Sequence, residues 1–328
     1  MGHYLLGIDV GGTNTKIGLF SVEGQLCARR SFPTRETGDR SCYSNLVVQL
    51  NELVAAHNAT LADIAAVGVA LPGTIDEAAT LALCPNLDLD LQFYTANLRL
   101  LIPGIPLVVL NDANAAAVGE GWQGCAVGID DFLMVTLGTG VGGGIVQSGK
   151  PYFGNHGAAG EIGHLCVCPT ESEACSCGRR GCLEQYASGS GIVRRVRRKL
   201  DGKTEKRRVP TSLAALEIIT PKEVFDHARA GDVLASEAVA EFIHCLGFGL
   251  AQIACVIDPE LIVVGGGLSA SAPWYLDDLT QAFEMYALSA CRKTPVVMAQ
   301  LGNDCGIFGA AAYALDSISS TARDCKKH

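Results

Sequence analysis

Short apolar runs recur along this chain, and most of them end at a glycine or a small polar turn. Such runs occupy residues 4–10, 64–71, 107–110, 132–137 and 261–264. Apolar runs of four to eight residues bounded by turn signals predict buried strands. Since helical patterns lie between them, we expect an α/β fold.

The sequence predicts helices in three longer segments, at residues 188–200, 236–257 and 307–315. The Asp258-Pro259 pair ends the second of these. Its most apolar part, residues 246–257, is about twelve residues long and contains Gln252. It is too short to span a bilayer and predicts a buried helix.

Two strand-turn-strand units share one design. The first strand of the first unit ends at Asp9, before the turn GGTNTK, and the second unit has the glycine turn 138–144 followed by a returning strand at 145–147. Glycine turns present successive N–H groups that bind anions. A plain hairpin explains the glycines alone, but Asp9 and Lys16 on its flanks favour phosphate binding. The repetition predicts a duplicated, two-lobed architecture with a ligand between the turns.

Composition and charge argue against some classes of function. The chain has 328 residues, 38 glycines and a net charge of -9, which argues against nucleic acid or an acidic membrane surface as the main partner. Residues 194–208 hold nine of the 25 Lys and Arg, but without interleaved aromatic residues they indicate a solvated helix and loop. The N-terminus lacks a signal-peptide pattern, so we expect a reducing cytoplasm.

Residues 161–184 contain five of the fourteen cysteines. His164, Cys175, Cys177 and Cys182 follow the spacing H-x10-C-x-C-x4-C, and this donor set predicts a closed Cys3His zinc site that staples the loop. Free or disulfide-bonded thiols are the less favoured alternative. Two further cysteines in this segment, at positions 166 and 168, compete as ligands.

At two other positions, the residue types by themselves allow two interpretations. Asp112 follows a strand and precedes an alanine-rich helix, so it suits a catalytic carboxylate and a helix N-cap equally. The Gly265-Gly266-Gly267 turn, before a helix expected from Pro273, suits a nucleotide or a plain strand-to-helix corner.

Seven motifs together resemble the ROK family of bacterial sugar kinases and repressors, in order and in content. They are DVGGTNTK (9–16), LPG (71–73), NDANAAA (111–117), GTGVGGG (138–144), EIGH (161–164), CSCGRRGCLE (175–184) and VVGGG (263–267). The resemblance implies the two-lobed, actin-like (ribonuclease H-like) ATPase fold with nucleotide and sugar between the lobes. It implies a smaller lobe at 1–112, a larger lobe at 113–306 with the zinc loop at 161–184, and a C-terminal helix, about 307–324, that packs back on the first lobe.

The resemblance also implies a role for each matched position. Asp112 is the general base for a sugar hydroxyl, and the metal ligands are His164, Cys175, Cys177 and Cys182. The sugar-binding positions are Gly73, Asn111, Asp112, Glu161, His164 and Glu184. The ATP-binding positions are Asp9, Gly11, Gly12, Thr13, Lys16, Thr139, Gly140, Gly265, Gly266 and Gly267.

The activity implied is ATP- and Mg²⁺-dependent phosphorylation of a hexose 6-hydroxyl, with glucose first and a structural Zn²⁺. N-Acetylmannosamine, N-acetylglucosamine, fructose and allose are alternative substrates, and polyphosphate is a lesser alternative donor. A sugar-responsive repressor is disfavoured, because the first phosphate hairpin begins by residue 4 and leaves no room for a preceding DNA-binding domain. We also expect a homodimer with no nucleic acid or membrane partner.

Overall fold

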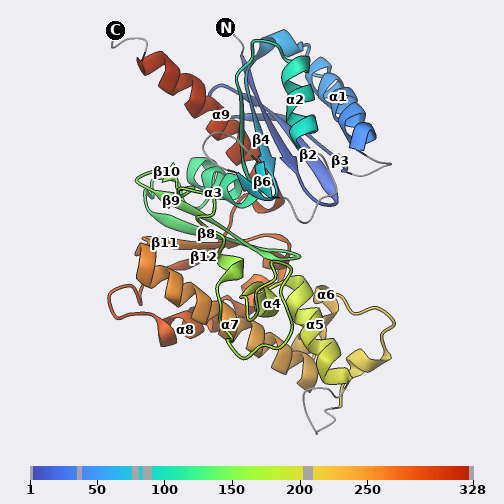
Figure 1. Ribbon diagram of the computed structural model, residues 1–328, viewed down its shortest axis with the longest axis vertical. Coiled ribbons are helices and arrows are strands. Elements are labelled where there is room, and N and C mark those ends of the chain that lie inside the picture. The colour runs from blue at the N-terminus through green and yellow to red at the C-terminus, as the bar shows by residue number, and fades with distance from the viewer. Residues whose placement is uncertain (1–2, 35–38, 76–80, 84–90, 202–209, 325–328) are drawn as a thin grey trace. The chain divides into compact units, whose positions relative to one another are not determined.

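Two five-stranded sheets run through the chain in a computed structural model that describes residues 3–34, 39–75, 81–83, 91–201 and 210–324 (Figure 1). The chain divides into two compact units. Unit 1 comprises Met1–Gly128, Gly144–Ala159 and Asn303–His328, and unit 2 comprises Ile129–Gly143 and Gly160–Gly302. The proposed lobe boundary at residue 112 stays a prediction.

The elements up to residue 123 are β1 (Tyr4–Val10), β2 (Asn14–Ser21), β3 (Leu26–Pro33), α1 (Asp39–Ala55), η1 (Leu61–Asp63), β4 (Ile64–Leu71), β5 (Thr74–Ile75), β6 (Leu81–Leu83), α2 (Leu91–Leu101), β7 (Leu107–Asn111) and α3 (Asp112–Gln123). The later elements are β8 (Phe132–Leu137), β9 (Val141–Gln147), β10 (Lys150–Pro151), η2 (Ile162–His164), α4 (Glu184–Ala187), α5 (Gly189–Leu200), η3 (Ser212–Ala215), α6 (Pro221–Arg229), α7 (Val233–Ile257), β11 (Leu261–Gly265), η4 (Gly267–Ser271), α8 (Ala272–Tyr286), β12 (Val296–Met298), η5 (Gly302–Asp304) and α9 (Cys305–Asp324).

The two sheets have the same strand order. The first is β3-β2-β1-β4-β7 and the second is β10-β9-β8-β11-β12, so each reads third-second-first-fourth-fifth in chain order. In the first sheet, β2 is antiparallel to β1 and to β3, whereas β1, β4 and β7 are parallel. In the second, β8, β11 and β12 are parallel. This repetition confirms the predicted duplicated α/β architecture.

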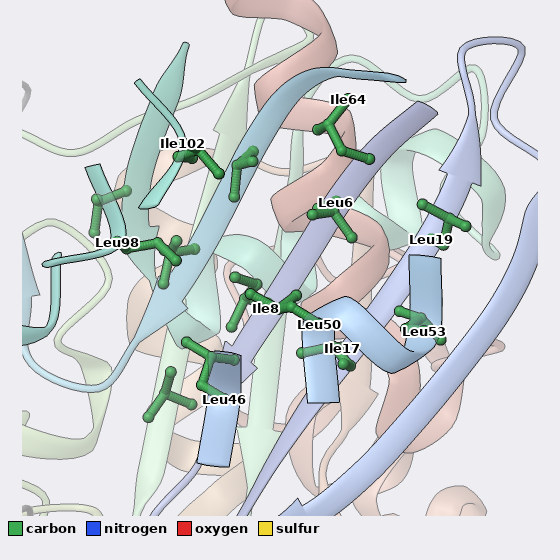
Figure 2. Close-up of a cluster of buried hydrophobic side chains, with 14 of the residues drawn as sticks. Leu6, Ile8, Ile17, Leu19, Leu46, Leu50, Leu53, Ile64, Leu98 and Ile102 are labelled. Atoms are coloured by element: carbon green, nitrogen blue, oxygen red, sulfur yellow. The ribbon is translucent and has the colours of Figure 1, made fainter. Parts of the chain in front are cut away.

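The apolar core of unit 1 lies between one face of its sheet and helices α1 and α2. Leu6 and Ile8 of β1 meet Leu46 and Leu50 of α1 and Leu98 of α2, and all five side chains are buried (Figure 2). Burying each such side chain contributes about 1.5–3 kcal/mol. Side chains alternate across a strand, so the residues between them face the opposite side.

Helix α9 covers that opposite face. Ile307 and Ala311 of α9 pack with Leu5 of β1, and the helix comes close to the strands because Gly7 and Gly68 stand beneath it. A Cβ at Gly68 would overlap the carbonyl of the α9 residue above it. The close approach places the N-terminal turn of α9 beside the end of β1.

Helix α7 passes through the core of unit 2. Within the described ranges it alone is long and apolar enough to cross a membrane by length and composition, and half of its most apolar window is buried. Phe242 of α7 packs edge-on against Phe225 of α6 and Tyr275 of α8. The predicted buried helix is therefore confirmed, although it begins at Val233.

Candidate functional site

Candidate residues of unit 1 lie at or just after the carboxyl ends of three parallel strands. Asp9 is at the end of β1, Gly73 follows β4, and Asn111 is the last residue of β7. The registers pair Asp9 with Ala70, and Leu71 with Asn111. These ends therefore lie at one edge of the sheet, the usual location of sites in open α/β sheets.

Asn111, and not Asp112, caps α3. Its Oδ1 accepts hydrogen bonds from the backbone N–H groups of Ala113 (2.9 Å) and Asn114 (3.1 Å), and its Nδ2 donates to the Gly73 carbonyl at 2.9 Å. Asp112 is the first helical residue and is exposed. The capping interpretation of Asp112 is therefore wrong, because a neighbouring amide already fills that position.

The environment of Asp112 suits a carboxylate that acts as a base. Its Oδ1 accepts from the Ala113 N–H at 2.8 Å, and the N-terminus of a helix favours negative charge. The carboxylate is exposed, so solvent or a ligand can reach it.

Hydrogen bonds hold the turn of the first hairpin in place, while two of its residues are exposed. The Gly11 N–H donates to the Asn14 carbonyl at 3.0 Å, and the Thr34 hydroxyl donates to the Gly11 carbonyl at 2.7 Å. Gly12 and Thr13 are exposed, and a Cβ at Gly12 would meet no atom. This geometry leaves room for an anion over the turn.

Asp9 and Lys16 are cross-strand partners at the base of this hairpin. The Asp9 carboxylate lies against the first turn of α9, where a Cβ at Gly306 would be 2.6 Å from it, and the Lys16 ammonium donates to the Asn303 carbonyl. Burial raises the pKa of Asp9 to about 6, although the Lys16 charge opposes the shift. Ionisation of Asp9 therefore lowers the stability of the folded protein when no cation is bound.

We expect Asp9→Asn to stabilise the ligand-free protein at pH 8. The pKa of Asp9 is raised above its ordinary 3.8, so its ionisation penalty is absent well below pH 4, grows between about pH 4 and 6, and is complete above pH 6. A shift of this size corresponds to on the order of 2–3 kcal/mol. Urea unfolding at pH 5 and pH 8 measures it, with the exposed Asp278→Asn as the control. Equal loss or gain in both variants would contradict the assignment.

In unit 2 the four predicted metal ligands come together. The ligand atoms of His164, Cys175, Cys177 and Cys182 all lie within 4.8 Å of one another. His164 Nδ1 is 3.8 Å from Cys175 Sγ, and the sulfurs of Cys177 and Cys182 are 3.7 Å apart. A tetrahedral ion with Zn–S bonds of about 2.3 Å sets its sulfurs about 3.8 Å apart. The donor set and spacing therefore fit zinc with no open position.

Two of the three thiols of this group ionise less readily than an ordinary cysteine, whereas the Arg179 N–H and the neighbouring thiols outweigh burial and lower the pKa of Cys177. Burial raises the pKa of Cys175, and burial together with the Cys177 thiol raises the pKa of Cys182 to about 12. A bound metal would displace these protons, so its affinity rises with pH. The candidate ligand group found among the described residues includes neither Cys166 nor Cys168.

The predicted sugar-binding residues of unit 2 surround this group. His164 stands between two carboxylates, with Nε2 3.9 Å from Glu161 Oε2 and Nδ1 3.8 Å from Glu184 Oε1. Burial raises the pKa of Glu161, opposed by His164. Glu184 Oε1 accepts from the Cys175 thiol at 2.9 Å and from the Ser176 hydroxyl at 3.0 Å. The metal group and both glutamates thus form one connected cluster.

Two glycine turns lie at the ends of neighbouring strands in the same unit. Gly265 of β11 is in register with Thr136 of β8, and a Cβ at Gly266, whose φ is +88°, would collide with the Leu137 backbone. The Thr139 carbonyl accepts from the Ser190 hydroxyl at 2.6 Å. A Cβ at Gly140 would lie 2.8 Å from Glu184 Oε2. The turn at Gly140 therefore adjoins the cluster formed by the metal group and the two glutamates.

The candidate residues thus form two groups, one per unit. Unit 1 contains Asp9, Gly11, Gly12, Thr13, Lys16, Gly73, Asn111 and Asp112, and unit 2 contains Thr139, Gly140, Glu161, His164, Cys175, Cys177, Cys182, Glu184, Gly265, Gly266 and Gly267. Ser176 and Ser190, whose hydroxyls donate to Glu184 and to the Thr139 carbonyl, were not predicted from the sequence. A single serine in a loop or first helical turn carries no periodic signal.

Known proteins resemble this chain over most of its length. A family model described as the ROK family matches residues 5–317. The chain belongs to the ROK family. A glucokinase of Halalkalibacterium halodurans is 35% identical to this ROK protein over 320 residues, 93% of each chain. An N-acetylmannosamine kinase of Shigella boydii is 31% identical, over 94% of this chain and 97% of the relative.

A solved structure of a ROK protein has the same fold as this chain. The crystal structure of a ROK family glucokinase from Streptomyces griseus, in complex with glucose and AMPPNP, superposes with a TM-score of 0.76. It is 33% identical, and the alignment covers 95% of this chain and 99% of that one. The resemblance found in the seven motifs is thereby confirmed, together with the fold it implied.

Proposed function

We propose that this ROK protein is an ATP-dependent sugar kinase that transfers the γ-phosphoryl group of Mg-ATP to the 6-hydroxyl of glucose. The observation that carries the proposal is Asp112, an exposed carboxylate at the start of α3 whose capping role is taken by Asn111. The glucokinase relatives, aligned over more than nine-tenths of the chain, support the choice of reaction.

Asp112 serves as the general base. It accepts the proton of the sugar hydroxyl as that oxygen attacks the γ-phosphorus, while the bond to the ADP oxygen breaks. Phosphoryl transfer asks a protein mainly for in-line positioning and for neutralisation of charge. A base of this kind contributes about 10²–10⁴-fold to the rate.

The glycine turns bind the nucleotide. Backbone N–H groups at Gly12 and Thr13 hold phosphate oxygens, and Lys16 adds positive charge. Gly11 shapes the turn through its hydrogen bond to the Asn14 carbonyl. Asp9 is the carboxylate suited to hold Mg²⁺, which when bound would neutralise charge on the phosphates. Thr139 and Gly140 contact phosphates, and residues 265–267 receive the adenosine.

Each unit contains residues suited to hydrogen-bond a sugar. Asn111 with the Gly73 carbonyl, and Glu161, His164 and Glu184, exchange hydrogen bonds with its other hydroxyls. Each hydrogen bond to a charged group contributes about 1.5–3 kcal/mol. A bound Zn²⁺ would act structurally, because four protein ligands close its coordination sphere and fix the loop that carries both glutamates.

N-Acetylmannosamine is the second candidate substrate, favoured by the relative that bears that name and is 31% identical. We further propose a cytoplasmic homodimer that binds no nucleic acid. The Cys3His metal group supports a reducing compartment, and four of the five basic side chains of α5 are paired within the chain.

Product analysis tests the position of transfer. We expect glucose to yield glucose 6-phosphate, with phosphorus coupled to the C6 protons in a ³¹P–¹H correlation spectrum. 6-Deoxyglucose, which binds through the same remaining hydroxyls, should give no sugar phosphate. Phosphorylation of 6-deoxyglucose, or coupling to the C1 proton, would contradict the proposed chemistry.

A further inference from the structure

Glu171 is a buried carboxylate in the loop between two metal-ligand positions, His164 and Cys175. Its side chain is 2% exposed. It accepts a hydrogen bond from the Tyr186 hydroxyl at 2.7 Å and from Arg198 Nη1 at 3.1 Å to both carboxylate oxygens. Carboxylates are almost never buried this fully unless they are paired.

The carboxylate also orders its own loop. Glu171 Oε1 accepts from the backbone N–H groups of Ser172 (2.8 Å) and Glu173 (3.1 Å). Burial raises the pKa of Glu171, but the Tyr186 hydroxyl, the Glu173 N–H and Arg198 outweigh it and hold the pKa at about 2. Glu171 is therefore ionised at every working pH.

Basic residues of α5 form ion pairs on two sides of the helix. Arg194 and Arg198 face Glu171, and both also pair with Glu173. On the other side, Arg195 pairs with Glu241 and Lys199 pairs with Glu237, both of α7. These ion pairs involve four of the five basic residues at 194–199. Residues 202–208 of the predicted basic segment lie outside the described residues. The basic helix is a clamp between the loop and α7.

Tyr186 connects this clamp to the sugar cluster. It lies two residues after Glu184 in α4, and the neighbour between them, Gln185, binds the same loop. Gln185 Nε2 donates to the Glu173 carbonyl at 3.1 Å, and Gln185 Oε1 accepts from the Cys182 N–H at 3.0 Å. The turn that carries Glu184 is thus held by the loop on one side and by a metal-ligand position on the other.

We infer that Glu171 is a positioning residue for the sugar site, which through Tyr186 and Arg198 fixes the turn carrying Glu184. The inference rests on the proposed function for its link to the sugar. Glu171 is not among the residues proposed to bind either substrate. Replacing one partner of a buried charged network leaves the other charge unsatisfied, so the loop and the α4 turn would separate locally while Asp112 and the nucleotide residues stay unchanged.

The test compares Tyr186→Phe and Glu171→Gln with Glu173→Gln. Tyr186→Phe removes one hydroxyl and keeps the ring over which Arg195 stacks at 5.3 Å. Glu173 is in the same loop and pairs with the same arginines, but its side chain is 47% exposed. We expect the sugar KM to rise about tenfold in Glu171→Gln, the scale of an outer-shell change, and less in Tyr186→Phe. The KM for ATP and kcat should stay within about twofold of the parent, and Glu173→Gln should match it.

Two further measurements separate positioning from general destabilisation. The double variant should cost much less than the sum of the single changes, because both remove one interaction. Zinc transfer to a chromogenic chelator should be faster in both single variants than in Glu173→Gln. If Glu171→Gln does not fold, Tyr186→Phe alone decides.

An unchanged sugar KM in folded Glu171→Gln, or in Tyr186→Phe if only that variant folds, would overturn the inference. Equal changes in sugar KM, ATP KM and kcat would also overturn it, since they would indicate a purely structural role. A parent protein that phosphorylates no sugar would instead contradict the proposed function, and the rate of zinc transfer would then decide whether Glu171 holds the loop.

Discussion

Asp112→Asn is expected to lower kcat for sugar phosphorylation by about 10²–10⁴-fold. The amide keeps the size of the side chain but cannot accept the hydroxyl proton, so the loss falls on the transition state. Since Asn111 caps α3, the helix should keep its stability. Steady-state kinetics with a coupled ADP assay measures the change, and calorimetric titration with glucose measures binding.

Glucose affinity of Asp112→Asn should stay close to that of the parent protein, because the other hydroxyl contacts remain. Asp278→Asn, an exposed carboxylate of α8, is the control for a change of charge alone and should keep full kcat. Near-normal turnover by Asp112→Asn would remove Asp112 from the role of base.

Removal of one metal ligand should have the second large effect. Purified protein is expected to contain about one zinc per chain, and Cys177→Ser should bind zinc at least about 100-fold more weakly, because four ligands together supply about 10–16 kcal/mol. Cys177 is exposed, so the substitution disturbs little packing. Loss of the ion should loosen the loop and raise the sugar KM.

Cys166→Ser is the matched control for the metal site. Cys166 is an exposed cysteine of the same loop but lies outside the ligand group. It should retain zinc and activity, as metal analysis and kinetics would show. A zinc-free wild-type enzyme with full activity would contradict the structural role of the ion.

Much of the site was predictable because its residues are close in sequence. The hairpin from Asp9 to Lys16 and the ligand group from His164 to Cys182 are short segments with diagnostic glycines or donor atoms. Each therefore carries its own geometry. The strands were predictable for a similar reason, since β1 and β8 have the predicted bounds.

Features that depend on distant contacts were not predictable. The residues alone suit Asp112 equally to a helix N-cap and a catalytic carboxylate. The structure shows that Asn111 is the cap, held in place by its bond to the Gly73 carbonyl, 38 positions away. The edge strand β3 mixes arginines with apolar residues and gives no clear period. Glu171 and Arg198 are 27 positions apart, so no local pattern reveals their pairing.

Sugar-dependent ADP release tests the proposed kinase activity most directly. Purified, zinc-containing protein with Mg-ATP should release ADP only when a sugar is added, with glucose giving the highest kcat/KM in a panel that includes mannose, fructose, allose, N-acetylmannosamine and N-acetylglucosamine. A folded protein that releases no ADP with any of these sugars would contradict it.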